Sequence, residues 1–294
     1  MTTKIAGNRL EGMPVLNLSL FQNVIAIILF HLGARFHFPS VQAAAWPGIL
    51  LALALAALPG DARAEEVSIA VAANFTAPMK AIVAQFEKDT AHKAAVSFGA
   101  TGKFYAQIKS GAPFDVFLSA DVEAPARLEK EGNAVAGSRF AYAVGRLALW
   151  SATPGFVDTH GEVLKSGKFA NIALASPRQA PYGAAALEAL TRLGLLAALE
   201  PKFATGESIG QTYSFVATGN AALGFVALSQ VFEDGKIKTG SAWIVPANLH
   251  KPLRQDAVIL TRGKDNQGAA DFMRFLRTET VRAVIQSFGY EATQ

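Results

Sequence analysis

The chain has 294 residues, of which 51% are hydrophobic and 17% are charged. This composition excludes a disordered chain, which combines low hydrophobicity with high net charge, and the length suggests two domains. The sequence has no cysteine, which excludes disulfides, thiolate nucleophiles and cysteine-ligated zinc. The formal net charge of +4 is small for a nucleic-acid-binding protein, so no nucleic-acid partner is expected.

Residues 1–64 differ from the rest and are predicted to be an N-terminal extension and signal peptide. Ile49–Leu58 is an apolar run of signal-peptide length, shorter than a membrane span. Ala62-Arg63-Ala64 is an A-x-A cleavage site, so we expect export and cleavage after Ala64. The earlier apolar stretch, residues 15–33, is interpreted as sequence upstream of the true start. An uncleaved anchor and a buried helix are the alternatives.

The remaining chain alternates between strand and helix patterns. In residues 77–89, for example, Met79, Ile82, Val83 and Phe86 share one face of a helix. Strands are predicted over residues 67–73, 94–98, 114–118, 146–150, 172–175, 223–228, 242–245 and 257–260. Helices are predicted over residues 77–89, 103–109, 121–130, 183–193, 208–218, 269–277 and 279–288. This alternation predicts an α/β protein with parallel sheets flanked by helices. Since no long linker interrupts the chain, we expect two lobes joined by crossing strands.

One short motif suggests a hydrolase. Gly206-Glu207-Ser208-Ile209-Gly210 matches the G-x-S-x-G nucleophile elbow, and Asp234 and His250 follow it. The match is only five residues long and no oxyanion-hole sequence accompanies it. We therefore expect Ser208 to cap a helix, and we keep a serine hydrolase using Ser208 as the alternative of another class. No enzyme activity is expected.

Neither a nucleotide site nor a metal site is indicated. Gly99–Lys103 resembles a truncated phosphate loop, but Phe104 stands where the loop needs Ser or Thr. His92, His160 and His250 are far apart and lack the spacing of metal ligands. We expect no cofactor and no free cation.

The chemistry is concentrated at four helix starts that follow a strand or a turn. Asn74 follows the strand at 67–73, and Thr101 follows the strand at 94–98. Tyr182 follows the strand at 172–175, and Ile209 opens the helix after Ser208. Helix N-termini at the carboxyl ends of parallel strands present unpaired N–H groups and partial positive charge. If the four starts converge, they form an anion site that needs no lysine or arginine.

Several blocks in the chain resemble the periplasmic molybdate-binding proteins, the solute receptors of ABC importers. The resemblance runs from Val67 to the C-terminus. It is carried by five stretches: Ala72–Met79, Phe98–Ile108, Gly111–Asp121 (GAPFDVFLSAD), Ala180–Gly183 and Leu223–Val226. It implies a two-lobe periplasmic-binding-protein (type II) fold, with each lobe a mainly parallel sheet flanked by helices. Lobe 1 would contain residues 65–143 and 255–294, and lobe 2 residues 144–254, with the ligand in the cleft between them.

The resemblance also implies roles for single residues. Asn74 and Thr101 stand at positions where the family has side-chain donors, and Tyr182 stands where some members use a tyrosine. Ile209 stands at a position that contributes its backbone N–H. Some members place a further tyrosine where this chain has Ala227, and we expect Tyr182 to compensate for that missing hydroxyl. The ligand would be molybdate, or tungstate, which is nearly isosteric with it. The expected partner is a membrane permease of an ABC importer, with the receptor a periplasmic monomer.

Two other classes of protein share this architecture: receptors for other small oxyanions and the effector domains of transcription regulators. A site made of neutral donors suits an anion without protons, such as molybdate, because a protonated phosphate would leave a polar group unpaired. Sulfate is also free of protons and must be excluded by size, so a receptor for sulfate or another small oxyanion is the main alternative. The effector domain of a transcription regulator is less compatible, since residues 1–64 carry an apolar run where a DNA-binding helix pair would stand.

Overall fold

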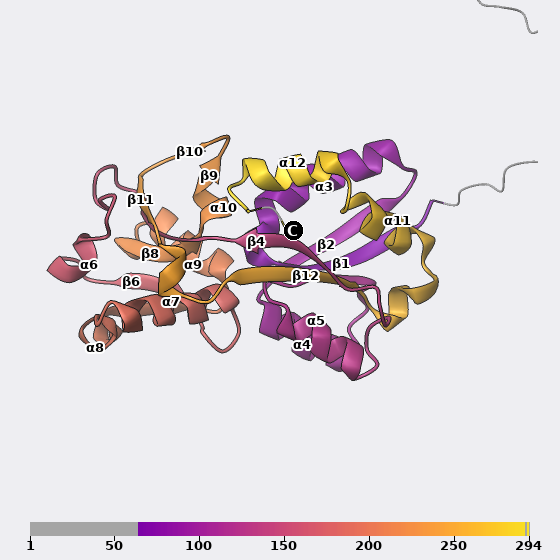
Figure 1. Ribbon diagram of the computed structural model, residues 1–294, viewed down its shortest axis with the longest axis horizontal. Helices are drawn as coiled ribbons and strands as arrows, with labels where there is room; N and C mark the ends of the chain where they lie inside the picture. Colours follow the sequence, from indigo (N-terminus) through magenta and orange to yellow (C-terminus); the bar gives the residue numbers. More distant parts are fainter. Residues whose placement is uncertain (1–63, 292, 294) are drawn as a thin grey trace, which may run out of the picture. The chain divides into compact units, whose positions relative to one another are not determined.

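The computed structural model describes residues 64–291 and 293 of the chain. The predicted extension and signal peptide, up to residue 63, lie outside the described residues. The described part contains two five-stranded sheets, each with helices on both faces (Figure 1). We call the part built on the first sheet lobe 1 and the part built on the second sheet lobe 2. The predicted two-lobe α/β fold class is confirmed.

The sheet of lobe 1 has the strand order β2-β1-β3-β12-β4. Its strands are β1 (Glu66–Ala72), β2 (Lys93–Gly99), β3 (Val116–Leu118), β4 (Phe140–Gly145) and β12 (Leu253–Ile259). Its helices are α3 (Thr76–Asp89), α4 (Thr101–Lys109), α5 (Glu123–Lys130), α11 (Gln267–Phe275) and α12 (Glu279–Ser287). Figure 1 shows α3, α11 and α12 on one side of this sheet and α4 and α5 on the other.

Alternation along β1 explains this two-sided packing. Val67, Ile69 and Val71 join the apolar cluster under α3, α11 and α12. Ala70, on the opposite face, joins Phe104 of α4 in a second cluster. Successive side chains of a strand point to opposite faces, so the consecutive apolar residues Ile69–Ala72 are buried on both sides. Burial on both faces, as in parallel sheets covered by helices, accounts for this run of apolar residues.

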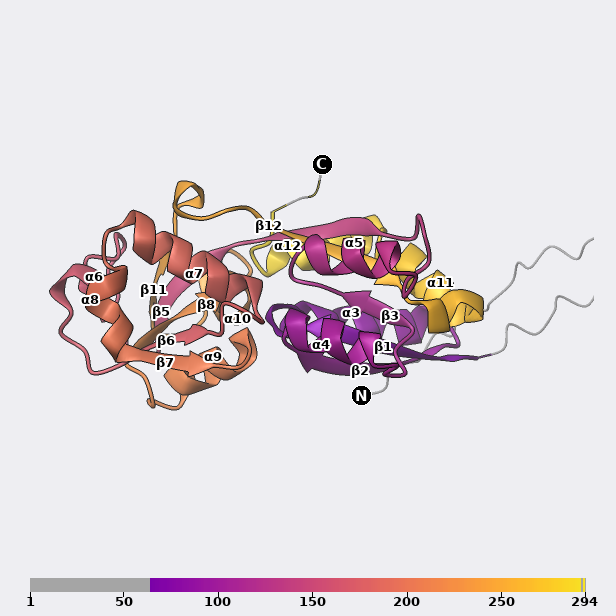
Figure 2. The same ribbon diagram turned by 90° about the horizontal axis from the view of Figure 1, so that it is seen from below.

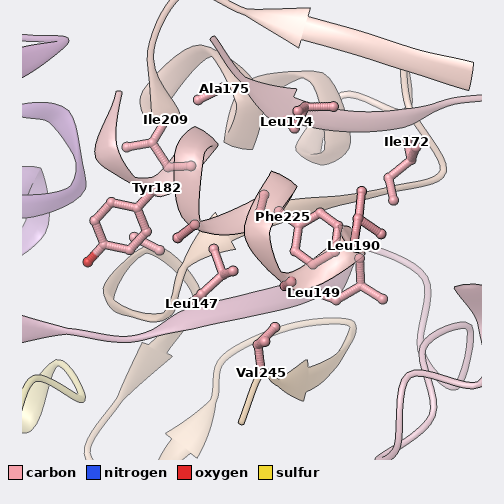
Figure 3. Packing of buried hydrophobic residues seen from close by; sticks show 14 of the residues in the cluster. Leu147, Leu149, Ile172, Leu174, Ala175, Tyr182, Leu190, Ile209, Phe225 and Val245 are labelled. Atoms are coloured by element: carbon pink, nitrogen blue, oxygen red, sulfur yellow. The ribbon is translucent and has the colours of Figure 1, made fainter. Parts of the chain in front are cut away.

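The sheet of lobe 2 has the strand order β11-β5-β8-β6-β7. Its strands are β5 (Leu147–Ser151), β6 (Ile172–Ala175), β7 (Phe203–Gly206), β8 (Leu223–Ala227) and β11 (Ser241–Ile244). Its longer helices, α7 (Pro181–Arg192) and α9 (Ile209–Ala217), lie on opposite sides of the sheet (Figure 2). Figure 3 shows the apolar cluster between α7 and the sheet, where Leu190 of the helix faces Leu149 and Phe225.

Short elements complete the chain. The 3₁₀ segments are η1 (Ala73–Phe75), η2 (Glu200–Lys202), η3 (Ala247–Leu249) and η4 (Thr261–Asp265). The short helices are α6 (Val163–Ser166), α8 (Leu196–Leu199) and α10 (Leu228–Val231), and β9 (Phe232–Glu233) pairs with β10 (Lys236–Ile237).

The two lobes are joined where the chain passes from β4 to β5 and from η3 to β12. β4 and β12 pair antiparallel, so both connections lie side by side (Figure 1). The expectation of crossing strands in place of a tether thus describes the observed connections. One detail differs: each sheet is mixed rather than mainly parallel, with two parallel and two antiparallel pairings. The antiparallel pairings arise because β4, β5 and β12 run through the connection between lobes.

No single helix among the described residues has the length and apolar character needed to cross a membrane. A bent pair, Pro181–Arg192 with Leu196–Lys202, meets those criteria by length and composition only.

Candidate ligand-binding site

All four helix starts singled out in the sequence reach the wall of one small cavity. Asn74 and Thr101 come from lobe 1, and Tyr182 and Ile209 come from lobe 2. The other lining residues are Ala72, Ala73, Gly99, Ala100, Ala120, Ala180 and Pro181. None of the lining residues is charged. The wall therefore combines apolar surface with neutral polar groups.

Parallel pairing brings the helix starts to the same edge within each lobe. In lobe 1, Ala72 at the end of β1 lies beside Gly99 at the end of β2. In lobe 2, Ala175 at the end of β6 lies beside Gly206 at the end of β7. The helix that follows each strand then begins at the carboxyl edge of its sheet, where ligands bind in open α/β folds.

Thr101 is the first residue of α4, after the extended residue Ala100. It is 3% exposed, and its Oγ1 accepts a hydrogen bond from the backbone N–H of Ala120 at 3.0 Å. Because the hydroxyl oxygen acts as acceptor there, its hydrogen remains free to be donated. The backbone N–H of the next residue, Gly102, donates across the lobes to the carbonyl of Gln179 at 2.9 Å.

Asn74 lies in η1 and is 1% exposed. Its Nδ2 donates to Oε1 of Gln255 at 2.8 Å and to the hydroxyl of Tyr290 at 2.9 Å. Its Oδ1 is buried and has no hydrogen-bond partner among the described residues. A buried amide oxygen without a partner is costly, and an oxyanion cannot satisfy it, because both groups only accept hydrogen bonds.

Tyr182 is positioned by the start of α7, with Pro181 at the first helical position. Gly183 permits a close approach there, since a Cβ at that residue would overlap the carbonyl of Ala175 at the end of β6. The Tyr182 hydroxyl points away from the apolar cluster of lobe 2 (Figure 3) and accepts from Nε2 of Gln255 at 3.1 Å. Burial, reinforced by the neighbouring Tyr290, raises the pKa of Tyr182 well above its ordinary value. The hydroxyl therefore stays protonated and can donate.

Ile209 is the first residue of α9, and its backbone N–H has no acceptor among the described residues. Ser208 precedes it in an extended conformation, and the Ser208 hydroxyl oxygen accepts from the backbone N–H of Gln211 at 3.2 Å. Gln230 supports the same turn, because its Nε2 donates to the Ile209 carbonyl at 3.1 Å. Ser208 is thus the helix cap that we expected. His250 is occupied elsewhere, with its Nδ1 2.7 Å from the carbonyl of Lys251.

The charged groups nearest the cavity lie outside its wall. A larger groove of about 470 Å³ adjoins it and shares four lining residues with it, Thr101, Ala120, Ala180 and Pro181. The groove carries both signs of charge: Arg127, Arg178, Lys251 and Arg254 with Asp121, Glu123 and Glu188. On another side, Lys103 of α4 pairs with Glu207 before α9, which is a further contact between the lobes. No group of three or more His, Asp or Glu side chains among residues 64–291 could hold a metal ion.

Gln255 is the residue of this site that the sequence pattern did not reveal. It is fully buried, lies on β12 and touches both Asn74 and Tyr182. The strand was predicted to begin at Ala257, because Arg254, Gln255 and Asp256 resemble a polar loop. A glutamine in a short polar run gives no signal of burial, so only the structure could assign it.

Two lobes with neutral polar groups from both around one cavity are typical of solute-binding proteins that close on a small ligand. Residues 67–291 match the family described as bacterial extracellular solute-binding protein, and the chain belongs to this family.

Similar proteins of known identity agree with this class. The molybdate-binding protein ModA of Azotobacter vinelandii is 57% identical over 242 residues, covering 82% of this chain and 96% of the relative. ModA of Rhodobacter capsulatus is 50% identical over 253 residues, covering 86% and 98%. The solved periplasmic molybdate-binding protein of Azotobacter vinelandii superimposes with a TM-score of 0.75 at 41% identity, covering 78% of this chain and 100% of that chain. The resemblance read from the sequence is therefore confirmed.

The sulfate-binding protein SubI of Mycobacterium tuberculosis has a TM-score of 0.63 and only 13% identity, covering 78% of this chain and 88% of that chain. That similarity shows the shared fold alone. The relatives are solute-binding proteins, so the family assigns this chain a receptor role and gives no support to the hydrolase alternative.

Proposed function

We propose that this protein is a receptor that binds molybdate between its two lobes and delivers it to the permease of an ABC importer. The observation that carries the proposal is the common cavity of Asn74, Thr101, Tyr182 and Ile209, whose wall has no charged residue. The high identity to two molybdate-binding proteins supports the choice of ligand. The proposed ligand-binding lobes are residues 65–143 with 255–294, and residues 144–254.

The chemistry of the wall favours an anion that only accepts hydrogen bonds. Two donors are proposed from side chains, the Thr101 hydroxyl and the Tyr182 hydroxyl, and one from the backbone at Ile209. When its nitrogen faces the ligand, the Asn74 amide supplies a donor in place of the Tyr182 hydroxyl. Each charge-assisted bond contributes roughly 1.5–3 kcal/mol. Three such bonds contribute roughly 4.5–9 kcal/mol, which is of the same order as the 8 to 12 kcal/mol that a micromolar to nanomolar dissociation constant (Kd) requires.

Location and assembly follow from the same proposal. We propose that the segment before Glu65 directs export and is removed, so that the receptor works in the periplasm. We further propose that it is a monomer, because a single chain supplies both walls of the cavity. Tungstate, with nearly the same size and charge, is proposed as a second ligand.

A thermal-shift series tests the proposed function. At 1,000 times its Kd, a ligand adds about 4 kcal/mol to the free energy of unfolding. For a domain of this size, 1 kcal/mol shifts the melting temperature (Tm) by about 2–4 °C. We expect molybdate and tungstate to raise the Tm by roughly 10 °C, and sulfate and phosphate at the same concentration to raise it far less. A larger shift with sulfate would contradict the proposed ligand and favour a sulfate receptor.

The pH dependence of binding tests the donor chemistry. Threonine, asparagine and backbone N–H groups do not titrate, and burial keeps the raised pKa of Tyr182 above the ordinary tyrosine value of about 10. We therefore expect the Kd for molybdate, measured by calorimetry at constant ionic strength, to be unchanged between about pH 7 and 9. A tenfold loss of affinity with a midpoint inside that range would mean that a titrating group holds the anion.

A further inference from the structure

Gln255 joins Asn74 of lobe 1 to Tyr182 of lobe 2. Its Oε1 accepts from Asn74 at 2.8 Å and from the hydroxyl of Tyr142 at 2.9 Å, and its Nε2 donates to Tyr182 at 3.1 Å. It is fully buried, but it does not line the cavity. The strand bends at this point, because the register between β12 and β4 shifts between Gln255 and Asp256. Gln255 therefore stands behind the site, with contacts to both of its walls.

The space around this contact is kept free by Gly145, the last residue of β4. A Cβ at Gly145 would overlap the Tyr182 hydroxyl and would lie 2.5 Å from Nε2 of Gln255. Any side chain at residue 145 would force the two groups apart. The contact between Gln255 and Tyr182 thus depends on a second residue that itself makes no hydrogen bond to either side chain.

The direction of these hydrogen bonds determines what each donor can offer to a ligand. In the present arrangement Tyr182 accepts from Gln255, so its hydroxyl hydrogen is free, while both hydrogens of Asn74 Nδ2 are used. Rotating the Asn74 and Gln255 amides together exchanges these roles, because the oxygen and nitrogen of an amide occupy nearly equivalent positions. Asn74 Oδ1 then accepts from Gln255, Asn74 Nδ2 replaces the buried oxygen that has no partner, and Tyr182 donates to Gln255.

We propose that Gln255 is a positioning residue of the oxyanion site, which sets the donor direction of Asn74 and Tyr182 and makes them act as one coupled unit. The inference rests on the proposed function, since it needs an anion in the cavity. A ligand that only accepts hydrogen bonds favours the arrangement in which Asn74 Nδ2 replaces the buried Oδ1 that has no partner. The Gln255 amide, which contacts both residues, transmits that preference from Asn74 in one lobe to Tyr182 in the other. Groups in one hydrogen-bond network contribute non-additively.

A double-mutant cycle tests the coupling. The Kd for molybdate is measured by calorimetry for Gln255→Met, Tyr182→Phe and the double variant, and the Tm of each is recorded. We expect each single change to weaken binding about tenfold or more, and the double variant to be at least about fivefold tighter than the product of the two effects predicts. Gly145→Ala keeps glutamine at residue 255 but separates it from the Tyr182 hydroxyl. It should therefore weaken binding as Gln255→Met does, and its effect should be smaller in the Tyr182→Phe background.

A matched control separates positioning from stability. Ser151 is fully buried in lobe 2, and its hydroxyl donates to the carbonyl of Ala222 at 2.7 Å, away from the cavity. Ser151→Ala should lower the Tm and leave the Kd unchanged. If Gln255→Met does not fold, Gly145→Ala and the isosteric Gln255→Glu take its place in the cycle.

Two results would overturn the inference. If Gln255→Met weakens binding by the same factor in the wild-type and Tyr182→Phe backgrounds, Gln255 has only a structural role. If Gln255→Met leaves the Kd within twofold while Thr101→Ala weakens it, the site stands and the positioning role is wrong. A failure of the proposed function looks different, because then none of Thr101→Ala, Asn74→Ala and Tyr182→Phe changes the Kd for molybdate.

Discussion

Thr101→Ala is expected to weaken molybdate binding by about 10- to 150-fold, the equivalent of one charge-assisted hydrogen bond of roughly 1.5–3 kcal/mol. The reason is that the Thr101 hydroxyl oxygen already accepts from Ala120, which leaves its hydrogen for the ligand. The change also removes the acceptor of a buried N–H, so the Tm should fall as well. Calorimetric titration with molybdate gives the Kd, and a thermal melt without ligand gives the Tm.

Thr101→Ser is the matched variant, because it keeps the hydroxyl and loses only a methyl group. We expect its affinity to remain within about threefold of the wild-type value, an effect of less than 1 kcal/mol. Should Thr101→Ala bind as tightly as the wild type, or Thr101→Ser as weakly as Thr101→Ala, the hydroxyl would have no part in binding.

Ile209→Pro is expected to weaken molybdate binding by about the same factor as Thr101→Ala, because it removes the backbone N–H donor of Ile209. Proline is well suited to the first position of a helix, where its missing N–H disrupts no helical hydrogen bond. Ser208, which precedes it, already has the extended backbone that proline requires, with φ −143° and ψ 164°. Helix α9 should therefore persist, with an unchanged circular dichroism spectrum, while the Kd for molybdate rises about 10- to 150-fold.

Ile209→Ala is the control for the lost side chain, since Ile209 is 4% exposed and packs in the apolar cluster of lobe 2. It should lower the Tm and preserve most of the affinity, because its N–H remains. Equal affinities for Ile209→Pro and Ile209→Ala would exclude the backbone donor.

Much of the fold could be predicted because its strands are apolar at consecutive positions and its helices have regular apolar faces. Ile172–Ala175 was predicted at its observed limits, and Ser208 was predicted as the cap of α9. β7 was missed because Phe203–Gly206 is a short edge strand with one exposed residue, and it has no distinct apolar period. β4 was missed because alanines at alternate positions of Phe140–Gly145 give a weak pattern.

The candidate site was predictable only in part. A small or polar residue after a strand or turn indicates a helix start, and this pattern indicated the starts at Asn74, Thr101, Tyr182 and Ser208. The binding roles of Asn74, Thr101, Tyr182 and Ile209 came from the resemblance to molybdate-binding proteins. The pattern gives no information on what lies behind them. The Asn74 amide, for example, joins Gln255 and Tyr290 in a buried network. Asn74→Ala therefore affects the stability of the fold as well as binding, which makes Thr101 the cleaner position for a test.

The most direct test is a crystal structure of the protein with bound molybdate, in which anomalous scattering locates the molybdenum. We expect a single strong peak in the cavity, with the oxyanion in hydrogen-bonding contact with the Thr101 hydroxyl and the backbone N–H of Ile209. A peak in the adjoining groove beside Arg178 and Arg254, with the cavity empty, would show that charged side chains hold the anion and would contradict the account.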